Sequence, residues 1–207
     1  MTRRVFWLLA STLAAAPVPA CAQSHVSSQA PSRDYTPADV AFMSGMIYHH
    51  AQALLISGWA SSHGASADVR TLCERIIRGQ TDEIDLLSQW LADRHEPVPH
   101  VDPAHMMHGM GEHMMPGMLT DAQLAQLDRA RGAEFDELFL RFMIQHHEGA
   151  ITMVNELFAK GAGEENPVYK IASGVFADQT TEIERMQQML AAKIFGPPPV
   201  PATTNPR

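Results

Sequence analysis

The chain has 207 residues, of which 45% are hydrophobic and 18% charged, and its formal net charge is −8 at pH 7. This composition suffices for one globular domain, or for two small halves with a shared core, and argues against wholesale disorder. Negative charge without any cluster of Lys and Arg argues against a nucleic-acid partner. Methionine is unusually frequent, at 13 residues against 3 Trp and 3 Tyr.

The first 22 residues have the pattern of a signal peptide. Two arginines precede an apolar stretch, residues 5–18, that is too short to span a bilayer comfortably. We expect cleavage after Ala22, which would give an exported, periplasmic protein with no membrane span after processing. Lipidation of Cys21 is the alternative, and we favour it less because Pro19 is atypical of a lipoprotein site.

Four helical segments are predicted after a Ser- and Gln-rich leader, residues 23–35, that we expect to be disordered. Apolar spacing and capping residues place the helices at 36–60, 66–91, 120–160 with a break or bend at Gly132, and 166–195. The predicted caps are Thr36, Ser66, Thr120 and Asn166. A Pro-rich tail, 196–207, is also expected to be disordered, and no window alternates as a strand would.

The two halves of this helical region are copies of one another. DVAFMSGMIYHHAQA (39–53) aligns with DELFLRFMIQHHEGA (136–150), and the step from Gln80 to Glu83 aligns with that from Gln179 to Glu182. Each copy is therefore a helical hairpin, too small to bury an apolar face alone. We predict an all-α fold in which the two duplicated hairpins close into a four-helix bundle over residues 36–195.

The repeated Met-Ile-x-His-His step places histidines on the apolar faces of the first and third helices. At about 100° per residue, His50 and His147 fall at the centre of these faces, with His49 and His146 on their flanks. Thioethers occupy the same stripes and could be ligands beside the histidines, although methionine on such a face is more often packing. They are Met43, Met46, Met143 and Met153.

Polar residues also lie on core-facing stripes and could support the histidines. They are Asp39, Gln80, Glu83, Asp136, Gln179 and Glu182. A buried carboxylate needs a partner, and three arrangements satisfy this. The histidine–glutamate pairs could be polar pairs that fix helix register, they could bind a metal directly, or each glutamate could hold a ring whose other nitrogen faces a metal.

A Met- and His-rich loop, residues 96–119, separates the halves. Its candidate ligands are His105, Met106, Met107, His108, Met110, His113, Met114, Met115 and Met118. Pro and Gly prevent a long amphipathic element here, so core packing does not explain the composition, although a biased linker is the alternative. Thioethers favour Cu(I) or Ag(I), and imidazole also accepts Cu(II). Once the signal peptide is removed only Cys73 remains, so Met and His are the ligands that suit an oxidising compartment.

The chain resembles the domain of unknown function 305 (DUF305) family, a ferritin-like, four-helix family with periplasmic copper-binding members. The matching pieces are FMSGMIYHHAQA, MPGMLTDAQLAQL, GAEFDELFLRFMIQHHEGAI and the two Q-T-x-E-I steps. The resemblance implies a helical bundle that binds copper in the periplasm and contributes to copper tolerance. The copies depart from each other at Leu140, which replaces the methionine of position 43, and at Ile56, which replaces that of position 153.

The sequence therefore predicts a periplasmic copper scavenger or metallochaperone and not an enzyme, with silver as a surrogate ion. It would exchange metal with a copper export or oxidase protein in the periplasm. One alternative is a ferritin-like dinuclear oxidoreductase, for which core carboxylates are too few because the helical pair here is Gln-x-x-Glu instead of Glu-x-x-His. A metal-free structural or interaction module is the other.

Overall fold

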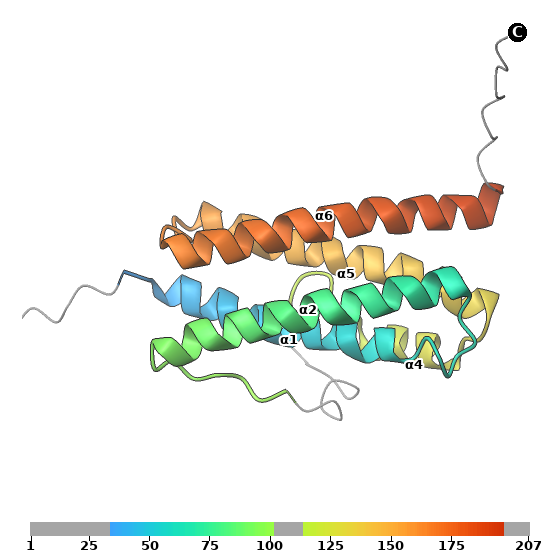
Figure 1. Ribbon diagram of the computed structural model, residues 1–207, viewed down its shortest axis with the longest axis horizontal. Helices are drawn as coiled ribbons and strands as arrows, with labels where there is room; N and C mark the ends of the chain where they lie inside the picture. The colour runs from blue at the N-terminus through green and yellow to red at the C-terminus, as the bar shows by residue number, and fades with distance from the viewer. Residues whose placement is uncertain (1–33, 102–113, 197–207) are drawn as a thin grey trace, which may run out of the picture. The chain divides into compact units, whose positions relative to one another are not determined.

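The computed structural model describes residues 34–101 and 114–196, which belong to one compact unit. Its helices are α1 (Pro37–Gly58), α2 (Ala67–Asp93), α4 (Asp121–Arg129), α5 (Ala133–Ala159) and α6 (Asn166–Phe195) (Figure 1). These residues contain no strand, so the all-α prediction is confirmed. The predicted signal peptide, most of the leader, the centre of the Met-rich loop and nearly all of the tail lie outside the described residues.

The helix starts follow the capping residues in two cases and depart from them in two. Thr36 and Asp39 form a reciprocal capping box at α1, as Thr120 and Gln123 do at α4. Ser66 precedes α2 but makes no side-chain capping bond. Asn166 was predicted as a cap, but it is the first residue of α6, and Glu165 occupies the cap position.

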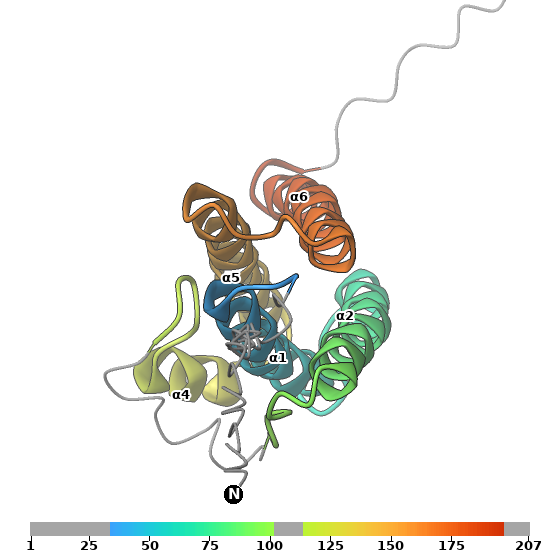
Figure 2. The ribbon, with the colours of Figure 1, turned by 90° about the vertical axis from the view of Figure 1, so that its left-hand side faces the viewer.

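The third predicted segment divides at Gly132. Its backbone has φ of +60°, a conformation that favours glycine, and the chain turns there between α4 and α5. The predicted break is therefore confirmed. The short helix α4 lies outside the four long helices of the bundle (Figure 2).

The bundle is assembled from its two hairpins. Helix α1 packs extensively along α2, and α5 along α6, while the hairpins meet chiefly through α1 and α5 (Figure 2). Helices α2 and α6 contact each other sparsely. Two clusters of buried side chains fill the interior, one around Phe135 and Phe139 and the other around Leu87 and Leu91. The weak α2–α6 contact leaves one side of the bundle less tightly closed than the other.

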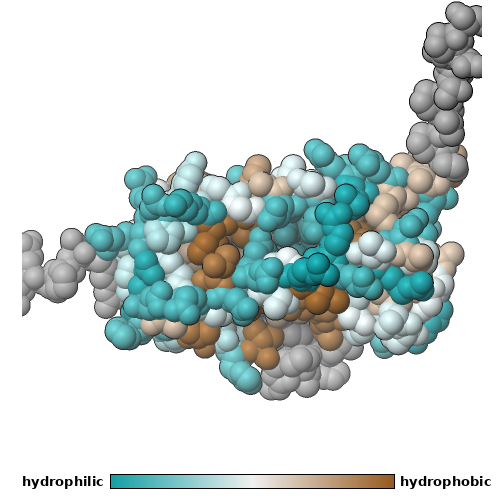
Figure 3. Space-filling view, in the orientation of Figure 1, coloured by the Kyte–Doolittle hydropathy of each residue, from teal (hydrophilic) through white to brown (hydrophobic). Residues whose placement is uncertain are grey.

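The outer surface agrees with a bundle that keeps its apolar residues inside. On the face shown in Figure 3, hydrophilic side chains predominate and hydrophobic ones show through in separate places. Within the ranges that the structure describes, no helix is long and apolar enough to cross a membrane.

Two buried aspartates tie each hairpin to the loop of the other. Asp39 accepts a hydrogen bond from the backbone N–H of Gly163, between α5 and α6, at 2.7 Å. Asp136 accepts one from the backbone N–H of Ser66, between α1 and α2, at 3.1 Å, and its other oxygen lies 2.6 Å from Lys193 Nζ. These carboxylates thus hydrogen-bond to the loops and not, among the described residues, to the histidines. They lie at the starts of α1 and α5 and satisfy polar groups there.

Replacing Asp39 by alanine should destabilise the fold strongly. The change removes the α1 capping box and leaves the buried Gly163 N–H without its acceptor, so we expect a loss of about 2–4 kcal/mol in the free energy of unfolding. Denaturant unfolding measures the difference. The matched control is Asp85→Ala on the exposed face of α2, which should stay within about 0.5 kcal/mol of the wild type. Equal losses in both variants would contradict the tie between hairpins.

Candidate metal centre

The four histidines of the repeated motif meet where α1 and α5 pack together. Their exposed fraction is 0% in every case. The rings of His49 and His146 lie 3.9 Å apart between centroids, with His50 and His147 one residue further along each helix. The motifs, distant in sequence, thus form one cluster of imidazoles inside the bundle.

Each of the four rings directs its Nε2 atom to an oxygen. His49 Nε2 lies 3.0 Å from the carbonyl oxygen of Pro116, and His146 Nε2 lies 3.0 Å from that of His49. His147 Nε2 lies 2.7 Å from Glu182 Oε2. His50 Nε2 approaches Glu83 Oε2 to 2.6 Å, although this contact is poorly aligned for a hydrogen bond. A carbonyl oxygen can only accept, so His49 and His146 must carry their protons on Nε2.

The Nδ1 atoms of all four rings are buried and have no hydrogen-bond partner within residues 34–101 and 114–196. With the proton on Nε2, each Nδ1 presents a lone pair to the interior. A buried acceptor without a partner costs about 1–3 kcal/mol, so four of them in one place need an explanation. Metal-binding histidines characteristically donate their remote N–H to a carboxylate or a backbone carbonyl. The donor set thus fits a metal ion that accepts imidazole nitrogen.

Burial keeps the two flanking histidines neutral at ordinary pH. Desolvation, followed by the effect of His50, lowers the pKa of His49 to about 3. Desolvation and then the neighbouring His49 lower the pKa of His146 well below its usual range. Neutral imidazole is the form that binds metal, so no proton has to be removed first.

The predicted thioethers of the helices divide between core and surface. Met43, Met46 and Met143 are fully buried among other apolar side chains, where packing alone accounts for their burial. Met153 is half-buried and lies with Met115 against Gly45. The copies therefore differ beside the histidines: position 45 is glycine and leaves room for Met115, whereas its counterpart is Phe142.

The end of the Met-rich loop is docked over the histidine cluster. Gln52 brackets the backbone of Leu119, donating to its carbonyl at 3.1 Å and accepting from its N–H at 2.7 Å. Gln145 donates to the carbonyl of Gly117 at 3.2 Å. A Cβ atom at Gly149 would lie 2.0 Å from the Pro116 oxygen. Only glycine lets the loop come close enough for Pro116 to reach His49.

Sequence reasoning missed the residues that hold this loop. Gln52 and Gly149 occupy equivalent positions of the two copies, as the 97-residue offset between the motifs shows. In one copy the side chain clamps the loop, and in the other its absence makes room for the loop. The sequence could have indicated these residues, because Gln52 and Gly149 differ in chemistry at equivalent positions of otherwise matching motifs. Such a difference marks a position at which the two copies have separate roles.

The remaining predicted residues are placed as follows. Met118 is buried and Met114 is 41% exposed. The other loop candidates lie outside the described residues, and they are His105, Met106, Met107, His108, Met110 and His113. Gln80 and Gln179 are buried on α2 and α6. Each lies about one helical turn before the glutamate of its helix, Glu83 or Glu182. Burial raises the pKa of the Cys73 thiol to about 12, which keeps it from acting as a thiolate.

Carboxylates and imidazoles do not by themselves complete a site. Across residues 34–101 and 114–196, no three side chains of His, Cys, Asp or Glu gather as one ligand set. A tetrahedral zinc site needs four such ligands, or three and a water. Low-coordinate soft ions, which can combine two nitrogens with thioethers, match this arrangement better.

These features define an all-helical bundle, built by duplication, with a buried cluster of neutral histidines. A family model described as a domain of unknown function (DUF305) matches residues 39–190. The chain belongs to the DUF305 family.

Solved structures of the same family resemble it. A DUF305 fragment from Deinococcus radiodurans is 28% identical, with a TM-score of 0.63, and the match covers 76% of this chain and 97% of that one. A DUF305 protein from Streptomyces coelicolor is 29% identical, with a TM-score of 0.64 and coverage of 75% and 93%. No curated protein sequence matches the chain.

CopM, solved in a Cu(II)-bound form, is also similar. It is 29% identical, with a TM-score of 0.60 over 73% of this chain and 95% of that one. CopM has also been solved with Cu(I) and with silver. The chain is thus similar in fold to proteins that hold copper and silver.

Replacing Gly149 by alanine should undock the loop. The new methyl group would overlap the Pro116 carbonyl, so we expect a loss of at least about 2 kcal/mol in the free energy of unfolding. Gly174→Ala is the matched control, since a Cβ there meets nothing within 4 Å and alanine should stabilise helix α6 by up to about 1 kcal/mol. Thermal and denaturant unfolding of the two variants should move in opposite directions. Stabilisation by both would refute the docked geometry.

The stability of the metal-free protein should fall as the pH is lowered. His49 and His146 have folded pKa values below the unfolded value of about 6.5. Below that pH the unfolded chain therefore binds protons that the native protein excludes. Each such histidine should lower the free energy of unfolding by up to about 1.4 kcal/mol for every pH unit between pH 6 and 4. Denaturant unfolding at several pH values measures the slope, which His49→Gln should make shallower. An unchanged slope in the variant would be evidence against a buried neutral ring.

Proposed function

We propose that this protein is a periplasmic carrier for copper, acting as a scavenger or metallochaperone in copper tolerance. The bound ion is Cu(I), with Ag(I) as its surrogate and Cu(II) as a second accepted state. The ion is cargo, to be bound and passed on, and the protein is not an enzyme.

The observation that carries this proposal is the set of four buried Nδ1 atoms, none of which has a hydrogen-bond partner among the described residues. Structural histidines in a core would use both ring nitrogens, because an unpaired buried acceptor is destabilising. Here three of the Nε2 atoms are hydrogen-bonded to oxygens, that of His50 lies 2.6 Å from a carboxylate oxygen of Glu83, and the Nδ1 atoms are available. The rings are thus oriented in advance, and a metal ion supplies the missing partner.

Sulfur decides which ion the cluster prefers. Met46 precedes His49 and His50 by about one helical turn, and Met143 has the same relation to His146 and His147. Met43 lies on the same face, and all three thioethers are buried. We assign these methionines and the four histidines as ligands, with at most two of the histidines on any one ion, because no three of them gather as one ligand set in the described part of the chain. Glu83 and Glu182 would hold His50 and His147. Thioether with imidazole selects Cu(I) and Ag(I) over Zn(II) or Mg(II).

The Met-rich loop would capture the ion before it reaches the core. Met114 is exposed, and Met115 and Met153 line a half-open pocket of about 190 Å³ beside Gly45. The next residue, Pro116, contacts His49 directly. Capture at the loop followed by exchange inward needs ligands that bind and release easily, as thioethers do. Met115, Met153 and the loop residues 105–118 are the proposed capture ligands.

Export by the N-terminal segment would place this carrier in the periplasm. Its protein partner is then a copper export or oxidase protein of that compartment. The similarity to CopM in copper-bound and silver-bound forms supports the choice of metal. A dinuclear oxidoreductase would need several core carboxylates as metal ligands. Glu83 and Glu182 are instead directed at histidine rings, and this supports a carrier function over an oxidoreductase.

An anaerobic Cu(I) titration against a chromogenic competitor tests the proposal. The wild-type protein should bind tightly, and the double variant H49Q/H146Q should bind at least about tenfold more weakly because it loses two ligands. The double variant M115L/M153L should lose part of the affinity while keeping the fold. His95→Asn, at an exposed histidine outside the cluster, is the control and should bind as the wild type does.

Two outcomes would overturn the copper assignment. If H49Q/H146Q bound Cu(I) within twofold of the wild type, the histidine cluster would be structural. If the wild type failed to compete for Cu(I) and retained iron or zinc, the carrier function would be wrong. Circular dichroism of each variant separates loss of ligands from loss of fold.

A further inference from the structure

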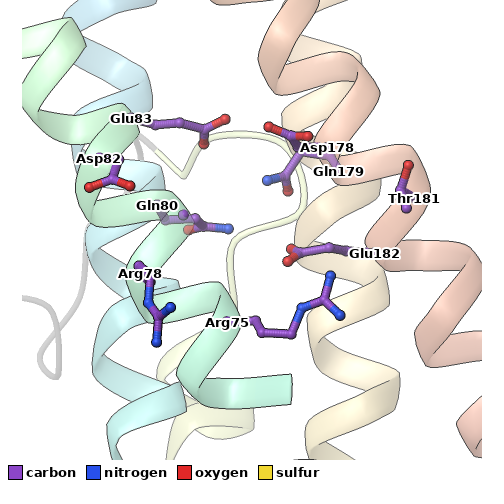
Figure 4. Close-up of a pocket in the computed structure, with 10 residues that line it drawn as sticks. Arg75, Arg78, Gln80, Asp82, Glu83, Asp178, Gln179, Thr181 and Glu182 are labelled. Carbon is purple, nitrogen blue, oxygen red and sulfur yellow. The ribbon is translucent and has the colours of Figure 1, made fainter. Parts of the chain in front are cut away.

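A polar cavity lies on the opposite side of the histidine–glutamate pairs from the bundle core. It has a volume of about 330 Å³ and opens between α2 and α6, where the two helices contact each other sparsely. Figure 4 shows side chains from both helices directed into it. The thioethers assigned above are not among its lining residues, so its chemistry differs from that of the copper site.

The lining is dominated by oxygen. Asp82, Glu83, Asp178 and Glu182 contribute four carboxylates, against two arginines, Arg75 and Arg78. Glu83 and Glu182 each use Oε2 for a histidine, which leaves Oε1 for the cavity. Figure 4 shows Glu83 and Asp178 approaching the space from opposite helices. Four carboxylates against two arginines leave the lining with an excess of negative charge, which favours a cation.

Two buried amides point to a ligand independently of this charge. Gln80 is 2% exposed and Gln179 is 1% exposed, and both line the cavity. Both amide atoms of Gln80 and the Oε1 atom of Gln179 are buried, and no described residue hydrogen-bonds to them. Each unpaired group destabilises the fold by desolvation. The two amides come from equivalent positions of the duplicated hairpins and face one another across the cavity (Figure 4).

We infer that the α2–α6 cavity binds a hard divalent cation of the Mg²⁺ and Mn²⁺ class, held by carboxylate and amide oxygens from both hairpins. Carboxylate and amide oxygens are the ligands that these ions prefer. No three carboxylates of the described residues converge closely enough to enclose a bare ion. The cation therefore keeps part of its water shell, as Mg²⁺ commonly does, and the cavity is large enough for it.

The bound cation would strengthen the sparse contact between α2 and α6. It bridges α2 and α6 through opposite walls of the cavity and neutralises the repulsion between Glu83, Asp178 and Glu182. It also provides partners for the Gln80 and Gln179 oxygens. This site needs neither copper nor the thioethers, so it does not rest on the function proposed above.

Mn²⁺ is the probe for this site, because its free ion is counted directly by electron paramagnetic resonance. Copper-free protein should bind Mn²⁺ saturably at about 100 mM salt, where diffuse surface attraction is screened, and Mg²⁺ should displace it. Asp178→Asn should weaken binding at least about tenfold, because it removes a charge that faces the cavity. Glu74→Gln, an exposed charge change on α2 outside the cavity, should leave the affinity unchanged.

Gln80→Leu separates a ligand role from a packing role. Leucine removes an unpartnered buried amide, so the free protein should become more stable while Mn²⁺ binding weakens. Binding that is the same in Asp178→Asn, Gln80→Leu and the wild type would place Mn²⁺ elsewhere, such as at the loop histidines, and would overturn the site. Absence of binding at millimolar Mn²⁺ would also overturn it. Cu(I) affinity, measured separately, reports on the proposed carrier function and is independent of either result.

Discussion

Each of the four buried imidazoles directs its Nε2 atom at an oxygen, and these contacts hold the helices and the loop together. Four imidazoles buried in a helical core are tolerable only if their N–H groups find acceptors. The acceptors come from different parts of the chain: the loop at Pro116, the backbone of α1, and carboxylates on α2 and α6. Satisfying the rings therefore fixes the positions of the loop and of the other helices together.

The same contacts divide the molecule into two chemical environments. On the inner side, the Nδ1 atoms of the four rings lie buried near the proposed thioether ligands. On the outer side, Glu83 and Glu182 line the α2–α6 cavity together with other oxygen-bearing side chains. The proposed soft and hard sites would then lie on either side of the histidine–glutamate pairs. Ions of different classes would be sorted by ligand chemistry, since neither side offers what the other ion prefers.

Duplication of the hairpin explains why the contacts in the core repeat, and divergence of the two copies explains why the surface that faces the loop does not. The histidine–glutamate pairs and the aspartate ties repeat in both hairpins, because both copies must close against each other. The positions facing the loop have diverged. Gln52 clamps Leu119 where its counterpart Gly149 admits Pro116, and Gly45 admits Met115 where its counterpart is Phe142. One face of a nearly symmetric bundle thereby became the place where the loop docks.

The four long helices, the break at Gly132 and the pairing of hairpins can be predicted from the sequence, because these depend on local periodicity, capping and internal repetition. The sequence also placed His50 and His147 inward opposite Glu83 and Glu182, since helical spacing fixes which residues share a face. It did not indicate that Asp39 and Asp136 accept hydrogen bonds from loops distant in sequence.

The folded structure was needed to show which ring nitrogen is engaged, where Pro116 docks, and that Gln80 and Gln179 face an open cavity. Three of the ring nitrogens are hydrogen-bonded to residues 35 to 97 positions away in the sequence, and no local pattern encodes the distance or orientation of such contacts.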